Sequence, residues 1–95
     1  MPYTILVTPA AAEDIAAAVD HYNAIATDLG YRFVELVEDY FGRISELPTA
    51  SEVRYRNVRC KPMKRFPFLI MFTIDNEAHA VNVLRIFNTY QEPLY

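Results

Sequence analysis

A short basic segment carries most of the side chains that could do chemistry in this chain. Six of its nine lysine and arginine residues fall within twelve consecutive positions that contain no acidic residue. They are Arg54, Arg56, Arg59, Lys61, Lys64 and Arg65. Such a cluster can attract phosphates or the carboxylates of a partner, even on a chain with a net charge of −3. A solvated strand edge whose charges resist aggregation is the alternative, and the charges alone leave both interpretations open.

The two halves of the chain differ in charge. Residues 1–52 carry nine acidic side chains against two arginines, whereas residues 53–95 carry seven basic side chains against three acidic ones. The halves are therefore about −7 and +4, since 2 − 9 = −7 and 7 − 3 = +4. We expect a target or partner to bind the basic second half.

The histidines and the single cysteine do not form a catalytic or metal-binding pattern. His21 and His79 lie 58 positions apart, which does not indicate a metal site, so neither a metal nor another cofactor is expected. His21 is predicted on a helix surface and His79 in an exposed turn. Cys60 has no second cysteine to pair with and is interpreted as a small buried residue in a reducing, intracellular setting.

Length and hydropathy predict one globular domain over residues 1–95. The apolar fraction of 53% is sufficient for a packed core. The start, MPYTILVTPAAAED, lacks the features of a signal peptide, and no run of about 18 apolar residues is present. A cytoplasmic protein without membrane contact is therefore expected.

The stretch Lys64–Ile74, KRFPFLIMFTI, contains the predicted central strand, which follows a turn at residues 62–65 and is expected to be buried on both faces because of its aromatic and β-branched content. The other predicted elements are a strand Tyr3–Val7, helices Pro9–Asp28 and Tyr31–Leu47, a loop Thr49–Val53, a strand Arg54–Lys61 and a strand Ala80–Phe87. The order β-α-α-β-β-β predicts an α+β fold in which a helical hairpin packs on a small, mainly antiparallel sheet.

Local signals set the predicted helix ends and faces. Thr8 is the expected N-cap with Pro9 at the first helical position, and Gly30 is expected just beyond the end of the first helix. Gly42 interrupts the second helix and suggests a close contact. The apolar stripes are predicted at Ala12, Ile15, Val19, Tyr22, Ala26 and Leu29, then at Phe33, Leu36, Val37, Tyr40, Phe41, Ile44 and Leu47.

The sequence resembles the RelE/ParE superfamily, the toxin halves of bacterial type II toxin–antitoxin pairs. The matching pieces are AAAEDIAAAVDHY, ISELP, VRCKPMKRFPFLIMFTID and VNVLRIFNTYQEP, and together they span nearly the whole chain. The RFPF entrance to the central strand is the most specific of them. Many relatives carry a histidine and an arginine after the last strand, where this chain has Asn88 and Gln91.

A RelE-like member would cleave messenger RNA on the ribosome by attack of a 2′-OH on the adjacent phosphate. This chemistry needs a base, an acid and positive charge on the phosphorane. The resemblance implies Arg59, Lys61 and Arg85 as the cations and Tyr90 as the C-terminal tyrosine. A tyrosine with an ordinary pKa is a poor base, so packing of the Tyr90 ring on the sheet is the preferred interpretation. For Arg85, pairing with a carboxylate is the alternative.

A ParE-like member would instead bind DNA gyrase and need no catalytic residues. The long helical hairpin and the weak acid–base set favour this subgroup, whose toxins act in growth inhibition and plasmid stabilisation. A third possibility is a degenerate member that only binds an antitoxin or assembles with itself. All three imply an antitoxin partner, in a hetero-oligomer where the cluster from Arg54 to Arg65 meets acidic side chains.

Overall fold

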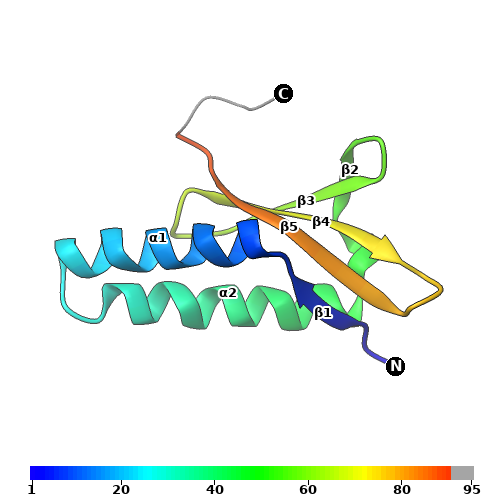
Figure 1. Ribbon diagram of the computed structural model, residues 1–95, viewed down its shortest axis with the longest axis horizontal. Coiled ribbons are helices and arrows are strands. Elements are labelled where there is room, and N and C mark those ends of the chain that lie inside the picture. Colours follow the sequence, from blue (N-terminus) through cyan, green and yellow to red (C-terminus); the bar gives the residue numbers. More distant parts are fainter. Residues whose placement is uncertain (91–95) are drawn as a thin grey trace.

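The sheet joins the beginning of the chain to its end. The computed structural model describes residues 1–90 (Figure 1). Its elements are β1 (Thr4–Val7), α1 (Pro9–Ile25), α2 (Leu29–Glu46), a 3₁₀ turn η1 (Pro48–Ala50), β2 (Glu52–Tyr55), β3 (Val58–Pro62), β4 (Phe68–Asp75) and β5 (Ala80–Asn88). The strands form one sheet in the order β1-β5-β4-β3-β2. β1 is parallel to β5, and the other neighbours are antiparallel.

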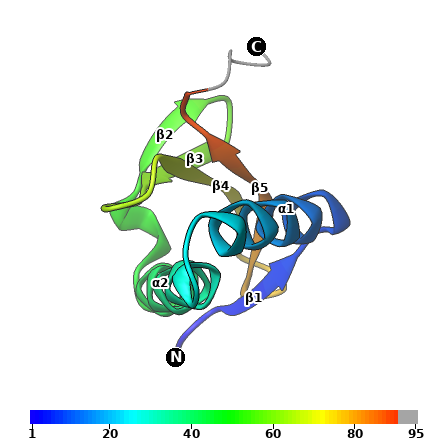
Figure 2. The same ribbon diagram turned by 90° about the vertical axis from the view of Figure 1, so that its left-hand side faces the viewer.

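The two helices form an antiparallel hairpin that covers one face of this sheet (Figures 1 and 2). Side chains from both helices and from β4 and β5 make one core, in which Tyr40, Phe33, Phe72 and Ile70 are the largest fully buried members. The predicted α+β layering is therefore confirmed. Within residues 1–90, no helix is long and apolar enough to cross a membrane.

β4 is the middle strand, as predicted, but only one of its faces is fully buried. Phe68, Ile70 and Phe72 point into the core, whereas Leu69 and Met71 are half-exposed. The prediction of burial on both faces was wrong because the helices form a layer on one side only. Because the residues of β4 from Phe68 to Phe72 are all apolar, the sequence does not show that alternate side chains face opposite sides of the sheet.

The basic segment forms a hairpin rather than one strand. Residues 54–61 were predicted as a strand after a loop, but β2 and β3 pair antiparallel, with Glu52 opposite Cys60. The chain reverses at Arg56, whose φ of 52° lies in the left-handed region. Arginine seldom adopts that conformation, so the turn was not recognised from its residue types. The sheet consequently has five strands where four were predicted.

The start of α1 is as predicted. Thr8 is the N-cap, and its hydroxyl oxygen accepts a hydrogen bond of 3.2 Å from the N–H of Ala11. The predicted stripe is confirmed at Ile15, Val19 and Tyr22, which pack against the core, but Ala12 is exposed and the fully buried residues of α1 are Ala11 and Ala18. Alanines at these positions bring the backbone of α1 close to β5.

The junction between the helices differs from the prediction. α1 ends at Ile25, and Asp28 takes the left-handed conformation expected of Gly30, with a φ of 69°. Gly30 lies in the first turn of α2 and faces α1, where its N–H donates to Asn23 Oδ1 at 3.0 Å. A Cβ atom there would lie 2.6 Å from Asn23 Oδ1 and 2.9 Å from the carbonyl oxygen of Val19. Glycine is needed here for close helix packing.

Replacement of Gly30 by alanine should lower the free energy of unfolding by about 1–3 kcal/mol, because the backbone oxygen of Val19 cannot move aside without separating the helices. Chemical denaturation measures the change. The control is Gly42→Ala in the same helix. A Cβ atom there meets nothing within 4 Å, contrary to the close contact predicted, so this variant should gain about 0.5–1 kcal/mol. Equal effects at both positions would contradict the packing argument.

Candidate functional site

The β2–β3 hairpin distributes the six clustered basic residues over four places. Arg54 lies in β2 and Arg56 in the turn that follows. Arg59 and Lys61 lie in β3, and the last two, Lys64 and Arg65, lie in the connection from β3 to β4. The segment that is continuous in sequence is thus not one patch in space.

Arg59 and Lys61 point to the side of the sheet that carries the helices. Their partners across β4 are the buried residues Phe72 and Ile70. The Nη1 group of Arg59 donates to the backbone oxygen of Ser51 at 2.7 Å, and Lys61 Nζ lies 6.0 Å from the centre of the Tyr40 ring. These contacts hold η1 and α2 against β3, so both cations take part in packing at this end of the sheet.

The remaining four basic side chains are exposed, and we call them the exposed basic set: Arg54, Arg56, Lys64 and Arg65. Two apolar residues of β2 lie beside Arg54 and Arg56, with Val53 45% and Tyr55 58% exposed, whereas Lys64 and Arg65 lie at the other end of β3. Arg56 lies over the Tyr55 ring, 5.3 Å from its centre. Exposed cations next to exposed apolar side chains are suited to an acidic, partly apolar partner segment.

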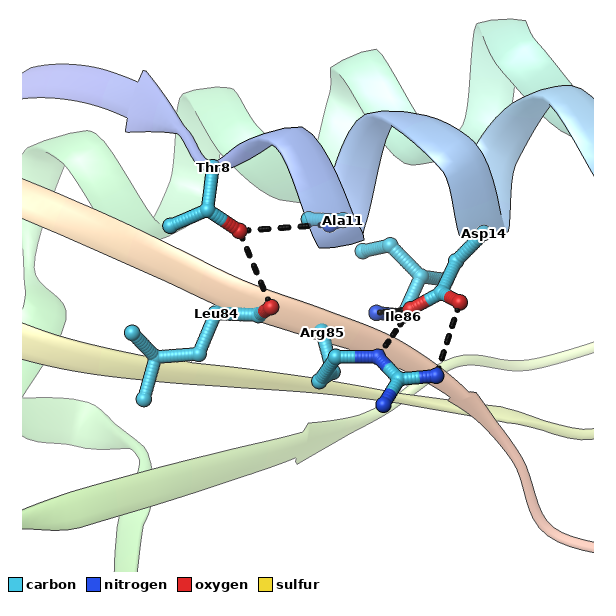
Figure 3. Close-up of polar contacts among 6 residues, drawn as sticks. All are labelled: Thr8, Ala11, Asp14, Leu84, Arg85 and Ile86. Carbon is cyan, nitrogen blue, oxygen red and sulfur yellow. Dashed lines mark hydrogen bonds and ion pairs between the residues drawn. The ribbon is translucent and has the colours of Figure 1, made fainter.

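Arg85 is held by a carboxylate that sequence reasoning had not connected with it. Asp14 of α1 accepts from Arg85 Nε at 2.6 Å and from Arg85 Nη2 at 2.9 Å (Figure 3). The hydrogen bond to Asp14 raises the pKa of Arg85 above its ordinary value. The pairing predicted as an alternative for Arg85 is therefore present, and it turns two of the guanidinium's donor groups toward α1.

Asp14 also accepts a backbone hydrogen bond from β5 at a point beyond the end of β1, where β1 no longer pairs with β5. β1 pairs with β5 only as far as Val83, and a bulge at Leu84 shifts the register between β5 and β4. Beyond that point the hydroxyl of Thr8 donates to the carbonyl of Leu84 at 3.0 Å, and Asp14 Oδ2 accepts from the N–H of Ile86 at 3.0 Å (Figure 3). The side chains of Thr8 and Asp14 thus provide hydrogen-bond partners for the backbone groups of β5 that β1 does not reach.

The sequence contained one sign of this arrangement. Asp14 lies three positions after Ala11 and four before Ala18, so it shares their helix face, which packs against β5. An acidic residue on a small-residue, buried face requires a polar partner. The sequence did not show which residue that partner is, because Arg85 lies 71 positions away.

Replacement of Asp14 by alanine should lower the free energy of unfolding by about 1–3 kcal/mol, because it removes three hydrogen bonds and leaves the Ile86 N–H and the Arg85 guanidinium without their partner. Thermal and chemical denaturation test this. Asp14→Asn can still accept from Ile86 and should lose less. The neighbouring control is Glu13→Ala, on an exposed position, which should stay within about 0.5 kcal/mol of the parent.

Tyr90 does not pack on the sheet, contrary to the preferred interpretation. Its side chain is 87% exposed, and its backbone N–H donates to Asn88 Oδ1 at 2.9 Å. The pKa of Tyr22 is raised, mainly by burial and secondarily by Tyr90, and both residues line one groove. Gln91, the second altered position of the C-terminal segment, lies outside the described residues.

Two hollows meet at His21. A wide, open groove of about 1120 Å³ runs between the helical hairpin and the β3–β4 connection, with Arg65 and Tyr90 among its lining. A smaller hollow of about 360 Å³ lies between α1 and β5 and is lined by Asp14, Arg85 and Asn88 as well as His21. The predicted cations Arg59 and Lys61 line neither hollow, so the four suggested catalytic residues do not share one.

The remaining reactive side chains show ordinary structural environments. Cys60 is buried, as predicted, and burial raises the pKa of its thiol. His79 lies in the turn after β4, where its ring stacks on Tyr3 with 3.9 Å between the centres. Within residues 1–90, no three His, Cys, Asp or Glu side chains come together as a metal site requires.

Solved structures with this arrangement are toxin–antitoxin proteins. A chain of the chromosomal ParDE system from P. aeruginosa superimposes with a TM-score of 0.78 and 21% identity, covering 90% of this chain and 95% of that one. A chain of the RelBE2 toxin–antitoxin complex from Mycobacterium tuberculosis gives a TM-score of 0.61 and 22% identity, covering 93% and 99%. No curated protein sequence matches. The fold is therefore that of the RelE/ParE superfamily of toxins.

The sequence narrows the class further. Residues 5–93 match the family described as the ParE toxin of the type II toxin–antitoxin system parDE. Because the match spans nearly the whole chain, this protein belongs to the ParE toxin family. The resemblance found in the sequence is confirmed, and the protein is a toxin of the type II toxin–antitoxin class.

Proposed function

We propose that this chain inhibits growth by binding DNA gyrase in the cytoplasm and is neutralised by a cognate antitoxin. The observation that carries the proposal is the match of residues 5–93 to the ParE toxin family. The better superposition on a ParDE chain than on a RelBE2 chain, with TM-scores of 0.78 and 0.61, points the same way.

The contacts of the basic residues also favour binding over RNA cleavage. A RelE-like reaction would use cations that are free to meet the phosphorane as charge develops. Here Arg85 gives two of its donor groups to Asp14, and Arg59 donates to the backbone of Ser51. Both cations are engaged in holding elements of the fold together, and they lie on different strands, β5 and β3.

Expression of this chain alone in bacteria should arrest growth, and co-expression of its antitoxin should restore it. Gyrase inhibition predicts accumulation of cleaved DNA and a DNA-damage response while messenger RNA stays intact. Cut messenger RNA without DNA damage would instead identify a ribosome-dependent endoribonuclease and refute the gyrase target. Unaffected growth would identify a degenerate member that binds without acting.

We propose further that the antitoxin spans the exposed basic set. It would run from Arg54 and Arg56, with their neighbours Val53 and Tyr55, at one end of β3 to Lys64 and Arg65 at the other. The antitoxin would supply acidic side chains to the four cations and aliphatic ones to β2. Because exposed charges steer encounter, the association rate should be fast at low salt and fall as salt is added.

Changing all four residues of the exposed basic set to alanine should weaken antitoxin binding by roughly tenfold or more, mainly through a slower association rate that no longer depends on salt. Surface plasmon resonance at several salt concentrations measures this. The control is Arg32→Ala with Arg43→Ala, which removes two exposed positive charges from α2 and is compared with the double variant Arg54→Ala with Arg56→Ala. If the control weakens binding equally, the effect is one of net charge and the assigned surface is wrong.

A further inference from the structure

β1 is an edge strand whose outer side is largely unpaired. The backbone N–H of Thr4 donates to His79 and that of Thr8 donates to Val83, so these two residues face β5. In a parallel pair, both polar groups of a residue point to the same neighbour, and successive residues alternate. Leu6 therefore also faces β5, whereas Tyr3, Ile5 and Val7 direct their N–H and C=O groups outward.

Only the first of these outward residues is satisfied by the fold. The N–H of Tyr3 donates to the backbone oxygen of Ser45 at 2.9 Å, and the Ser45 hydroxyl donates to the oxygen of Tyr3 at 2.5 Å. Among the hydrogen bonds within residues 1–90, none engages the outward groups of Ile5 or Val7. The edge thus presents two donors and two acceptors from alternate residues, which is the pattern that an antiparallel strand needs.

The side chains of this edge are also unprotected. Leu6 is 50% and Val7 41% exposed, and the strand, Thr4–Val7, contains no charged residue. Pro2 and Pro9 lie outside it on either side and limit the free stretch to these few residues. An apolar edge without charge or bulge is a template for strand pairing.

The opposite edge of the sheet is different. β2 contains Arg54 and is followed by Arg56 in a left-handed conformation, and its register against β3 shifts between Val53 and Tyr55. Charge and irregularity of this kind oppose pairing with another strand. The β1 edge is therefore better suited than the β2 edge to pair with another strand, although both strands are exposed.

We propose that the β1 edge pairs with the β1 edge of a second copy of this chain, in an antiparallel, two-fold arrangement centred on Leu6. In that register Ile5 of each copy exchanges two hydrogen bonds with Val7 of the other, which gives four bonds in total. The two Leu6 side chains meet across the axis as a close, non-hydrogen-bonded pair. Each exposed apolar side chain and each outward backbone group then gains a partner.

Charge at the ends of the strand fits this register. Tyr3 of one copy lies opposite Pro9 of the other, so the start of one α1 approaches the Ser45–Glu46 end of the other α2, where Tyr3 is bonded. A helix start carries partial positive charge and a helix end partial negative charge, to which the Glu46 carboxylate adds. The same complementary contact is made twice, once on each side of the axis.

The interface is small, and its dimer should therefore be weak and dependent on concentration. In sedimentation and NMR experiments on the purified chain, the apparent mass should rise from 11.0 kDa toward twice that value as concentration increases. The amide protons of Ile5 and Val7 should become protected from exchange over the same range. Those of Thr4 and Thr8 are bonded to β5 and should be protected throughout.

Two substitutions test the edge. Val7→Pro removes an outward N–H that β5 does not use, so the fold should persist while the apparent mass stays at 11.0 kDa. Leu6→Lys places two positive charges against each other at the axis and should abolish association independently. The control is Val53→Lys on the β2 edge, at a similar exposure of 45%, which should associate like the parent chain.

The proposal does not depend on the gyrase target. It is overturned if the parent chain remains monomeric at every concentration with Ile5 and Val7 unprotected. It is equally overturned if association survives both Val7→Pro and Leu6→Lys, or if Val53→Lys abolishes it, because the contact would then lie elsewhere. Protection of Ile5 and Val7 that appears only when the antitoxin is added would assign this edge to the antitoxin and refute the second copy.

Discussion

The carboxylate of Asp14 holds the fold together at the point where its two layers meet. β1 is too short to cover β5, and the chain turns into α1 while the edge of β5 continues. Thr8 and Asp14 bridge that gap by binding the Leu84 carbonyl, the Ile86 N–H and the Arg85 guanidinium. The angle at which α1 crosses the sheet, and with it the position of the helical hairpin, follows from these bonds.

These contacts bear on function because they engage basic residues that could otherwise have stabilised charge in a reaction. Arg85 is the one basic side chain of β5, yet its Nε and Nη2 groups are bound to α1. Arg59 is similarly engaged by the backbone near η1. The fold thereby separates basic residues that stabilise it from those that remain exposed on the β2–β3 hairpin and the β3–β4 connection. Recognition of another macromolecule is the activity that such a surface serves best.

The sequence predicted those features that depend on composition and periodicity. The central position of β4, the helical hairpin, the Thr8–Pro9 helix start and the membership of the toxin superfamily all followed from local patterns. It did not predict features that depend on residues far apart. Asp14 and Arg85 are separated by 71 positions, and neither type indicates the other.

Two turns were missed because the residues in them are unusual. Asp28 and Arg56 adopt left-handed conformations without glycine, so the end of α1 was placed too late and the β2–β3 hairpin was predicted as one strand. Gly30 was assigned to a helix end when its purpose is the close approach of two helices. A glycine in sequence signals that space or an uncommon φ is needed, but not which of the two.

The pairing of β1 with β5 has a consequence for how this toxin is made. During synthesis the residues of β1 leave the ribosome early, and their partner strand, Ala80–Asn88, follows only after both helices and strands β2 to β4. Until then the sheet lacks its second strand, and Asp14 lacks both the guanidinium and the N–H that it binds. The nascent chain therefore cannot complete its fold until β5 has emerged. A cell that makes this protein is therefore exposed to the folded toxin only after β5 has emerged, which leaves an interval in which a separately made inhibitor can already be present.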